Sequence, residues 1–543
     1  MNTGYFNYPI PGNEVVQQYG PGSPEKIALK KALADLKKSE TDVPMFIGGK
    51  EVRTDSKIAI HPPHEIKHTL GYFYEGNEQH VKEAIEAAIN AKEAWGKMPW
   101  EDRAHIFLKA ADLVAGKYRG YINGTTMLGQ SKNAYQAEID SACELADFLR
   151  FNVHFLSEIY KQQPLNASGV HNRMEWRPLE GFVLAITPFN FTAIGGNLPA
   201  APAMCGNTVI WKPAYTQIYS AQMFMRILLE AGLPAGVINL LYVDGPALGN
   251  VCFNHPDFAG LHFTGSTGAF NAMYKHIGQN IGLYKSYPRI VGETGGKDFV
   301  LIHESADVDV AAIALVRGAF EFQGQKCSAA SRAYLPLNLA DAIKEKAIAH
   351  LATMKMGTVE DFTNFINAVI DERSFDKISG YIDKAKNNPD AKIIAGGKYD
   401  KSEGYFIEPT IIETTNPNFT TMCEEIFGPV LTVYVYDTNK WEQTIDMVNS
   451  TSPYALTGSV IAKDRAAIAF ATQKLRNAAG NFYVNDKPTG AVVGQQPFGG
   501  ARASGTNDKA GSQLNLYRWL SARTIKETFD PPRDYRYAFL GEE

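Results

Sequence analysis

The chain has 543 residues, which at about 150 residues per domain predicts several folding units rather than one small module. Its 45% apolar content and moderate glycine and proline content are those of a folded globular chain, which excludes a low-complexity or disordered protein. The formal net charge of −5, without a long basic run, argues against a nucleic acid as the main partner.

Cysteine usage and the N-terminal sequence indicate a reducing compartment. The five cysteines are too scattered for a disulfide framework and form no CxxC pair of the kind that binds zinc: Cys143, Cys205, Cys252, Cys327 and Cys423. The first twenty residues lack Lys and Arg, and no stretch approaches the roughly 20 apolar residues that span a bilayer. We therefore expect a soluble, cytoplasmic protein without membrane contact, and the mitochondrial matrix only if a targeting sequence has been removed.

The N-terminal part of the chain predicts an extended arm followed by helices. Residues 1–24 are rich in Gly, Pro and Asn and give way to the charged run Pro24–Lys38, which predicts a helix. Apolar residues then recur at about helical spacing in three longer stretches, which predicts three helices. These predicted helices are Glu78–Trp95, Trp100–Tyr118 and Lys132–Glu158.

From Gly181 onward, short apolar runs of β type alternate with helical stretches. The first set of predicted strands is Phe182–Thr187, Thr208–Trp211, Val237–Tyr242, Gly260–Phe263 and Arg289–Val291. This rhythm indicates a parallel sheet covered on both faces, with ligands bound at the carboxyl ends of its strands. The alternation recurs from Lys297 to about Phe482 and predicts a second α/β domain. Its clearest elements are the strands Phe299–Ile302, Ala333–Leu335 and Val430–Tyr436 and the helix Leu339–Met354.

Two less regular segments predict a pair of strands outside both sheets. Ser168–Trp176 and Asn515–Lys526 carry alternating apolar residues. Because open strand edges are usually covered, this pair indicates either a partner subunit, and hence an oligomer, or a cover from the same chain.

A glycine-containing turn is the candidate site for an anion. No G-x-G-x-x-G motif follows a strand, but Phe263–Gly268 stands between an apolar strand and a helical stretch. Its glycines let backbone amides approach an anion, and the helix N-terminus adds a favourable dipole. Taken alone, the segment also fits a plain strand-to-helix turn.

Three polar residues stand at positions suited to chemistry. Cys327 lies in a polar, glycine-interrupted segment, whereas the other cysteines are interpreted as inert core residues. Glu293 and Asn190 each follow an apolar run where a strand opens into a loop, a common place for catalytic groups. Lys326, next to Cys327, would favour the thiolate if its side chain pointed that way. Each of these residues, taken alone, is also an ordinary polar loop residue.

Seven motifs between about residues 180 and 505 together resemble the NAD(P)-dependent aldehyde dehydrogenase superfamily and occur in its order. They are Thr187–Asn190, Trp211–Pro213, Phe263–Ser266, Glu293–Lys297, Gly324–Cys327, Glu424–Pro429 and Pro497–Gly500. Thr294 departs from the leucine that is common there, which leaves the assignment intact. Three further segments look like the branch that oxidises L-glutamate γ-semialdehyde, in equilibrium with 1-pyrroline-5-carboxylate, in the second step of proline catabolism. They are Gln136–Asp140, Ala478–Lys487 and Val493–Lys509.

The resemblance implies an α/β fold of the aldehyde dehydrogenase type, with two Rossmann-like parallel-sheet domains and a small β oligomerisation arm. An NAD-binding domain would comprise residues 1–165 and 178–292, and a catalytic domain with the nucleophilic cysteine would comprise residues 293–484. Oligomerisation strands would lie at residues 166–177 and 511–530. Residues 485–510 would form a substrate anchor loop and return to the NAD-binding domain.

The resemblance also implies roles for individual residues. Cys327 would be the nucleophile, Glu293 the general base and Asn190 an oxyanion donor. NAD would be held by Thr187, Lys212, Gly265, Ser266, Thr267, Gly268, Ala269, Glu425 and Phe427. The substrate would contact Ser328, Gly490, Ala491, Phe191, Phe498 and Glu144, although the aromatic side chains also fit ordinary core packing. NAD is preferred over NADP because no arginine cluster suited to a 2′-phosphate is near these motifs, and no metal is implied.

The implied partners are a small-molecule substrate, one or more further copies of the chain, and a functional link to a proline dehydrogenase, with no nucleic acid and no membrane. Three rival hypotheses stay open. The first is an aldehyde dehydrogenase for another ω-semialdehyde or a simple aliphatic aldehyde. The second is a protein that kept the fold without activity. The third is a cysteine hydrolase, for which no convincing histidine partner is visible.

Overall fold

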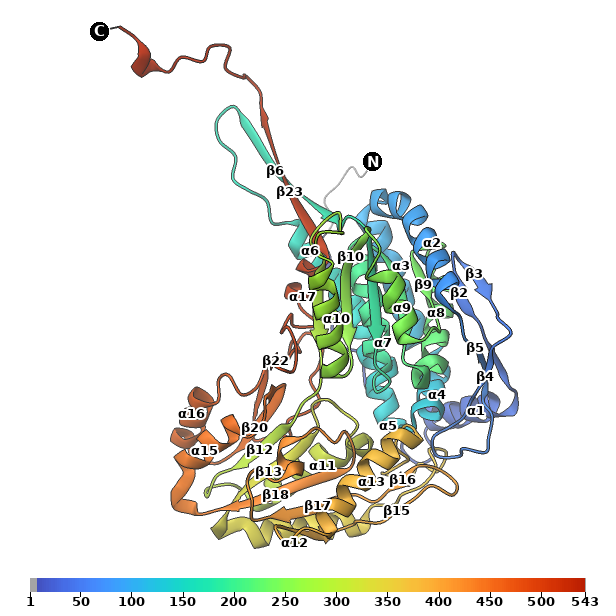
Figure 1. Cartoon of the computed structure of the whole chain (residues 1–543), viewed down its shortest axis with the longest axis vertical. Coiled ribbons are helices and arrows are strands. Elements are labelled where there is room, and N and C mark those ends of the chain that lie inside the picture. The colour runs from blue at the N-terminus through green and yellow to red at the C-terminus, as the bar shows by residue number, and fades with distance from the viewer. Residues whose placement is uncertain (1–6, 543) are drawn as a thin grey trace.

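The structure, a computed structural model, describes residues 7–542, so residues 1–6 of the expected N-terminal arm lie outside the described range. The chain forms two lobes, each built around a seven-stranded sheet, and a two-stranded ribbon projects from the first lobe (Figure 1). In the part of the chain that is described, no helix combines the length and apolarity needed to cross a bilayer.

The first lobe contains residues from both ends of the chain. Its helices are α1 (Pro24–Lys38), α2 (Glu78–Lys97), α3 (Trp100–Ala115), α4 (Arg119–Gln130), α5 (Ala134–Ala137), the π-helix η1 (Glu138–Glu144), α6 (Leu145–Tyr160), α7 (Thr192–Met204), η2 (Tyr215–Gln217), α8 (Ile218–Ala231), α9 (Gly245–Cys252), α10 (Thr267–Gln279) and α17 (Gln513–Tyr517). The strands of its large sheet are β2 (Met45–Ile47), β3 (Lys50–Val52), β7 (Phe182–Thr187), β8 (Thr208–Pro213), β9 (Ile238–Leu240), β10 (Phe258–Thr264) and β11 (Arg289–Glu293). A smaller sheet joins β1 (Thr41–Val43), β5 (Gly71–Tyr74) and β4 (Lys57–Ile60).

The large sheet of the first lobe has the strand order β11-β10-β7-β8-β9-β2-β3. The strands from β11 to β9 run parallel, and β2 and β3 continue the sheet antiparallel. The apolar run Phe182–Ala185 of β7 is completely buried, as expected for a central strand that is covered on both faces. The parallel strands place the residues that follow β7, β8 and β10 at one edge of the sheet.

The second lobe repeats this architecture. Its strands are β12 (Asp298–Ile302), β13 (Ala330–Pro336), β14 (Ala391–Ala395), β15 (Tyr399–Asp400), β16 (Phe406–Ile407), β17 (Thr410–Thr414), β18 (Val430–Tyr436), β19 (Tyr454–Ala455), β20 (Thr457–Ile461), β21 (Asn481–Val484) and β22 (Ala501–Arg502). Its helices are α11 (Val308–Phe320), η3 (Glu321–Gly324), α12 (Leu337–Thr353), α13 (Glu372–Lys386), α14 (Thr420–Cys423), η4 (Thr438–Lys440), α15 (Trp441–Ser450) and α16 (Arg465–Lys474). The large sheet has the order β14-β17-β18-β13-β12-β20-β21, in which only the edge strand β14 is antiparallel.

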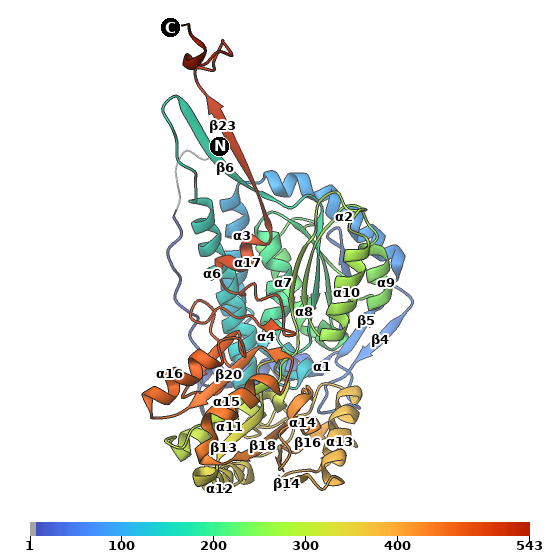
Figure 2. The ribbon, with the colours of Figure 1, turned by 60° about the vertical axis from the view of Figure 1, so that its left-hand side comes forward.

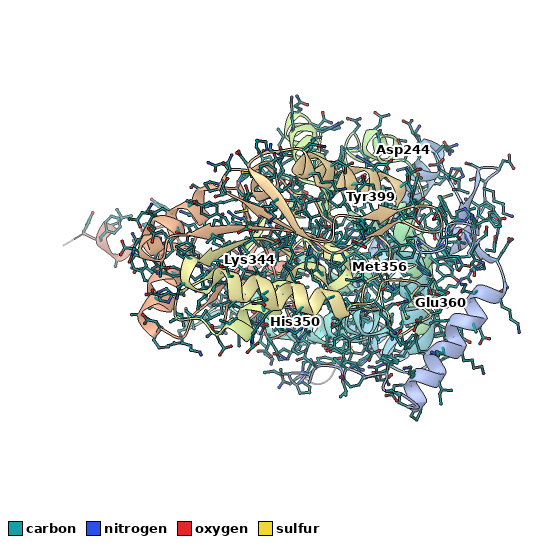
Figure 3. The ribbon with its side chains drawn as sticks, turned by 90° about the horizontal axis from the view of Figure 1, so that it is seen from below. Asp244, Lys344, His350, Met356, Glu360 and Tyr399 are labelled. Carbon is teal, nitrogen blue, oxygen red and sulfur yellow. The ribbon has the colours of Figure 1, made fainter. Side chains whose placement is uncertain are left out.

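Strand β12 shows why both faces of this sheet are covered. Phe299 and Leu301 belong to one apolar core, and Val300 and Ile302 belong to a second. Because successive side chains of a strand point to opposite faces, the two cores lie on opposite sides of the sheet. On the outside, α12 carries Lys344 and His350, and the loop after it brings Glu360 to α1 (Figure 3), where its carboxylate pairs with Lys37.

The projecting ribbon consists of β6 (Val170–Pro178) and β23 (Leu520–Thr528), which pair antiparallel along their full length. Both views show that it extends beyond the lobes, with the C-terminal segment at its far end (Figures 1 and 2). The expected strand pair is therefore present, but its second member was predicted to start too early. Residues 513–517 form α17 instead, because Ser512 caps that helix through its side-chain oxygen.

Two predicted helices differ from the observed ones. Trp100–Tyr118 ends at Ala115, and α4, which the pattern did not predict, begins at Arg119. The single helix expected over Lys132–Glu158 starts at Ala134, after the cap Asn133, and is interrupted by the π-helix η1. A π-helical turn holds an extra residue, so apolar spacing alone does not reveal it. This interruption changes which side chains of the segment face the site described next.

Candidate active site

Cys327 lies in the loop between η3 and β13, at the side of the second lobe that faces the first. It is half-buried, whereas Cys143, Cys205 and Cys252 are buried; Cys423 is also half-buried, so its prediction as a core residue was wrong. The loop is preceded by three consecutive residues in the left-handed region, Phe322, Gln323 and Gly324, with φ of 52°, 54° and 63°. The Gln323 amide donates to two backbone carbonyls at 3.0 and 2.9 Å, which holds this strained turn in place.

Asn190 approaches the same loop from the first lobe. It follows β7, is 3% exposed, and donates from Nδ2 to the carbonyl oxygen of Gln325 at 3.1 Å. Next to it, the rings of Phe189 and Phe427 meet edge to face with centroids 5.7 Å apart. The structure therefore brings Asn190 two residues from Cys327, across the boundary between the lobes.

Glu293 ends β11 and is turned toward the segment after β21. Its Oε2 accepts from the backbone N–H of Gly500 at 2.8 Å. Burial raises the pKa of the Glu293 carboxyl well above its usual value, while that N–H and the charge of Lys509 oppose the shift. A carboxylate with a raised pKa is a stronger proton acceptor once it is ionised.

The electrostatics around Cys327 disfavour a free thiolate. Burial raises the pKa of the Cys327 thiol, and the carboxylates of Asp298 and Glu293 raise it further. Lys326 does not offset these effects, because its Nζ lies 3.2 Å from the carboxylate of Glu321 and pairs with it. The thiol therefore needs a base at the moment of reaction.

Two glycines bring Glu425 and the Cys327 loop close to the start of β12. A Cβ on Gly295 would lie 2.3 Å from the Glu425 carboxylate, and one on Gly296 would lie 2.2 Å from the carbonyl oxygen of Cys327. The Gly296 N–H donates to Glu425 Oε1 at 2.8 Å. Any side chain at either position would push these two segments apart.

Lys297 and Asp298 follow these two glycines. Neither of them was assigned a role from the sequence, although Lys297 belongs to the motif Glu293–Lys297. Lys297 is 2% exposed, and within residues 7–542 its Nζ has no hydrogen-bond partner. Burial, together with the charge of Arg332, lowers its pKa to about 7. Asp298 accepts from the Thr457 N–H at 2.6 Å. Nothing in the spacing of the motif distinguishes such an unpaired lysine from a surface one.

A buried cluster of charged side chains packs against Phe191, and the sequence did not predict it. The Nζ of Lys132 pairs with Asp140 at 2.6 Å and lies 4.2 Å from the centroid of the Phe191 ring. It also lies 4.5 Å from the ring of Phe322, in the strained turn before Cys327. Glu144 is carried by the same π-helix as Asp140. Burial, followed by the charge of Asp140, raises the pKa of Glu144 to about 8.

The remaining substrate candidates belong to the segment between β21 and β22. The Ser328 hydroxyl lies 2.8 Å from that of Thr489, so this segment touches the residue after Cys327. Gly490 is exposed with φ of +98°, and Ala491 is half-buried. Phe498 is half-buried and pairs through its backbone with Ala510.

The candidates for cofactor binding lie at the carboxyl edge of the first sheet. Lys212, near the end of β8, has its pKa lowered by burial. The Thr187 hydroxyl is already engaged, since it accepts from Trp211 Nε1 at 3.1 Å and donates to Gln217 at 3.2 Å. Ser266 caps α10 by accepting from the Ala269 N–H at 3.3 Å.

The N-terminus of α10 fits a bound phosphate group. Gly268 is exposed, and an added Cβ there would meet no atom within 4 Å. Among the described residues, the Thr267 hydroxyl lacks a hydrogen-bond partner. The hydroxyl is buried, but the helix start around Gly268 is exposed, and backbone N–H groups at an open helix start suit a pyrophosphate, so this turn fits a dinucleotide.

Comparison with known proteins places this site in a family. The sequence pattern of the aldehyde dehydrogenase family matches residues 51–525. The chain belongs to this family. Its fold, with two parallel-sheet lobes, is the aldehyde dehydrogenase fold that the seven motifs predicted, and this prediction is confirmed.

Similar aldehyde dehydrogenases match almost the whole chain. "Delta-1-pyrroline-5-carboxylate dehydrogenase, mitochondrial" of Dictyostelium discoideum is 53% identical over 539 residues, 98% of this chain and 96% of that protein. The Homo sapiens protein of the same name is 47% identical over 529 residues, 97% of this chain and 94% of that protein. The crystal structure of the Mycobacterium tuberculosis Delta-pyrroline-5-carboxylate dehydrogenase bound with NAD superimposes with a TM-score of 0.96. It is 50% identical, and the match covers 100% of both chains.

Gly324 is a position of the site where an added side chain should do measurable harm. Its φ is +63°, and a Cβ would lie 2.2 Å from the carbonyl oxygen of Gly428. We expect Gly324→Ala to lower the melting temperature and to reduce aldehyde turnover at least about tenfold, because the backbone before Cys327 must move. Differential scanning fluorimetry and steady-state rates test this. Gly278→Ala on α10, where nothing lies within 4 Å, is the control, and equal behaviour of both variants would contradict the prediction.

Proposed function

We propose that this chain oxidises L-glutamate γ-semialdehyde, in equilibrium with 1-pyrroline-5-carboxylate, to L-glutamate with NAD, the second step of proline catabolism. The observation that carries the proposal is the meeting of Asn190 and Glu293, from the first lobe, at the half-buried Cys327 of the second. Family membership supports the reaction type, and the names of the relatives support the substrate.

The first chemical step follows from the aldehyde itself. Its carbon releases a hydride only after becoming tetrahedral, so a nucleophile must add first. Cys327 Sγ forms a bond to that carbon while the thiol proton passes to Glu293. The oxygen of the resulting thiohemiacetal is stabilised by the Cys327 N–H and by Asn190, whose Nδ2 has a second N–H besides the one given to Gln325.

NAD, when bound, supplies the acceptor for the hydride. The product of that transfer is a thioester on Cys327. After Glu293 has released the thiol proton to solvent, it takes a proton from a water molecule, whose oxygen bonds to the thioester carbon while the carbon–sulfur bond breaks. The product leaves as a carboxylate, and the sulfur regains its proton. The two roles of Glu293 explain why its raised pKa is useful in this site.

Each lobe has a proposed task. Residues 1–165 and 178–292 bind NAD, residues 293–484 carry the nucleophile, and residues 485–510 contain the anchor loop. In the NAD site, Lys212 and Glu425 bind the two riboses, the turn 265–269 binds the pyrophosphate, and Phe427 packs nearby. Thr187 contributes through its backbone, since its hydroxyl is already engaged.

The proposed substrate site matches an amino acid aldehyde. Ser328, Gly490 and Ala491 hold the α-carboxylate with hydroxyl and backbone donors. Phe191 and Phe498 pack on the aliphatic middle, and Glu144 lies beside the aldehyde end. The printed names of the relatives give the same substrate, which distinguishes this proposal from an enzyme for a simple aliphatic aldehyde.

Fewer observations support the proposed oligomeric state and cellular compartment. Within the proposed oligomerisation segments 166–177 and 511–530, β6 and β23 pair into a ribbon that stands away from both lobes, which favours a homodimer or larger homo-oligomer. An enzyme that oxidises proline is the proposed source of the substrate. The proposed compartment is the cytoplasm, and the alternative, if a targeting sequence has been removed, is the mitochondrial matrix; the names of the Dictyostelium and human relatives include the word "mitochondrial".

The test follows NADH absorbance with purified protein, NAD and 1-pyrroline-5-carboxylate. We expect kcat/KM for this substrate to exceed that for succinate semialdehyde and propanal by at least about tenfold, because only it carries both the α-amino and α-carboxylate groups. Faster turnover of another aldehyde would favour the rival dehydrogenase. A silent assay with all three aldehydes would favour the non-catalytic alternative.

A further inference from the structure

Residues 13–19, called here the N-terminal strap, form an irregular segment before α1. The strap packs against the π-helix η1 and against the segment that follows the proposed anchor residues. Sequence motifs gave it no role, and neither do the proposed catalytic steps. Its contacts are nonetheless buried and charged, which is unusual for a terminal arm.

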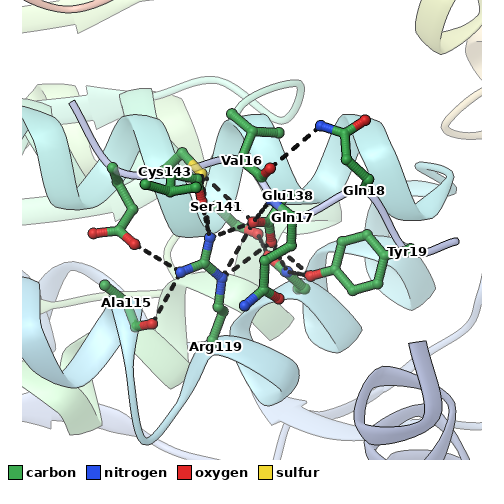
Figure 4. Close-up of polar contacts among 12 residues, drawn as sticks. Val16, Gln17, Gln18, Tyr19, Ala115, Arg119, Glu138, Ser141 and Cys143 are labelled. Atoms are coloured by element: carbon green, nitrogen blue, oxygen red, sulfur yellow. Dashed lines mark hydrogen bonds and ion pairs between the residues drawn. The ribbon is translucent and has the colours of Figure 1, made fainter. Parts of the chain in front are cut away.

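The first attachment of the strap is to Glu138, in the first turn of η1 (Figure 4). Glu138 is 0% exposed; its Oε1 accepts from the Gln17 N–H at 2.9 Å and its Oε2 from the Tyr19 hydroxyl at 2.6 Å. Arg119 of α4 pairs with the same carboxylate. Although burial opposes it, the hydrogen bonds from Arg119 and Tyr19 hold the pKa of Glu138 below its usual value. Arg119 thus neutralises the buried carboxylate, and the strap adds two hydrogen bonds to it.

The second attachment joins the strap to α6 and to the anchor segment. Asn13 donates from Nδ2 to the Asp147 carboxylate and to the Val493 carbonyl, both at 2.8 Å. Gln495 donates in turn to Asn13 Oδ1 at 2.9 Å. Between the two attachments, Glu14 pairs with Arg119 at 2.8 Å and with a second arginine, of α6, at 2.6 Å. One short segment therefore bridges η1, α6 and the residues after Ala491.

The π-helix transmits this attachment toward the substrate site. Two residues after Glu138, Asp140 accepts from the N–H groups of Thr192 and Ala193 at 3.0 and 2.8 Å, which fixes the start of α7 directly after Phe191. Asp140 also pairs with Lys132, whose Nζ lies over the Phe191 ring. A π-helical turn is locally unfavourable and is often found at functional sites, so it needs outside contacts to persist.

We propose that the N-terminal strap is a positioning element of the aldehyde pocket. It holds η1, with Asp140 and Glu144, on one side of the pocket and the Val493–Gln495 segment on the other. It thereby sets the affinity for a long, charged aldehyde such as glutamate γ-semialdehyde, whereas the hydrogen bonds of Asn13, Gln17 and Tyr19 reach none of the residues proposed to bind NAD. This inference rests on the proposed function.

The test uses the double variant Asn13→Ala with Tyr19→Phe, which removes one hydrogen-bonding group at each attachment. Because both attachments are weakened, we expect KM for glutamate γ-semialdehyde to rise about fivefold or more. We expect kcat, the Kd for NAD and the KM for propanal to stay within about twofold. Gln18→Ala is the matched control, because the Gln18 amide donates to Val16 of the strap itself at 3.3 Å.

Each outcome of these measurements either supports the inference or overturns it. A purely structural role would lower the melting temperature and the active fraction but leave KM for glutamate γ-semialdehyde unchanged, and that result overturns the inference. A parallel rise in KM for propanal, or the same rise in Gln18→Ala, overturns it as well. Tyr19→Phe alone keeps the buried ring and gives a smaller rise in KM if the inference is right. If the unmodified enzyme fails to oxidise glutamate γ-semialdehyde, the proposed function falls, and this inference with it.

Discussion

Cys327→Ala is expected to abolish NADH formation from glutamate γ-semialdehyde, with a loss in kcat of at least about 10⁴-fold, while the Kd for NAD changes little. Alanine cannot form the thiohemiacetal, and no bond to the aldehyde carbon means no release of hydride. The NAD candidates are carried by the ends of β8 and β10 and by Glu425 and Phe427, and the removed sulfur is not one of them. Stopped-flow absorbance at the NADH band and titration with NAD measure the two quantities.

Cys252→Ala is the control for this prediction. Cys252 is fully buried on α9 in the apolar core of the first lobe, and burial raises the pKa of its thiol. Its replacement should lower stability by about 1 kcal/mol and leave the rate intact. Appreciable turnover by Cys327→Ala, or loss of turnover in the control alone, would remove Cys327 from the role of nucleophile.

Glu293→Gln is expected to separate the two halves of the reaction. The amide cannot accept a proton from water, so thioester hydrolysis should slow by about 10²–10⁴-fold. If the thiol still loses its proton to solvent, one equivalent of NADH forms in a burst, followed by a slow steady rate. Rapid-mixing absorbance resolves both phases, and an unchanged steady rate contradicts the assignment. Glu304→Gln, at an exposed position after β12, serves as the control.

The same residue predicts a pH dependence. Glu293 accepts a proton only when it is ionised, and burial raises its pKa well above the usual value. The steady rate of the unmodified enzyme should therefore rise with pH through that raised pKa and fall below it, where the carboxyl is protonated. In Glu293→Gln this acid limb should disappear. An acid limb that persists with the same midpoint in the variant would assign the titration to another group.

Local patterns predicted the main strands of both parallel sheets because such strands are short, apolar and bounded by helices, but they did not predict the small sheet β1-β5-β4. The run Phe182–Thr187 was predicted with the bounds it has as β7, and Val430–Tyr436 with those of β18. The helix Pro24–Lys38 was also predicted with its observed bounds, since Ser23 caps it and Pro24 stands at its first position. The π-helix η1 was not predicted, because an inserted residue does not change the composition of a helical segment. Its contacts come from the strap, which is far away in the sequence.

The candidate site likewise contains residues that the sequence could reveal and residues that only the structure revealed. Cys327, Glu293 and Asn190 could be singled out because each stands in a short motif at the end of a predicted element, and the structure brings them together. Lys132, which pairs with a buried carboxylate and lies over two aromatic rings, could not be found from its neighbours in the sequence. Its contacts come from η1, from Phe191 and from the turn before Cys327, three segments far apart in the chain.

The sequence by itself determined the family, the alternation of strands and helices, and the residue types available for chemistry, because these depend on local spacing and on motifs in order. Only the tertiary structure decided the charge environment of those residues. Burial and neighbouring carboxylates raise the pKa of the Cys327 thiol, Glu321 pairs with Lys326, and the strap donates hydrogen bonds to the buried Glu138. These effects depend on distance through space and on exclusion of water, neither of which is encoded in the spacing of residues along the chain.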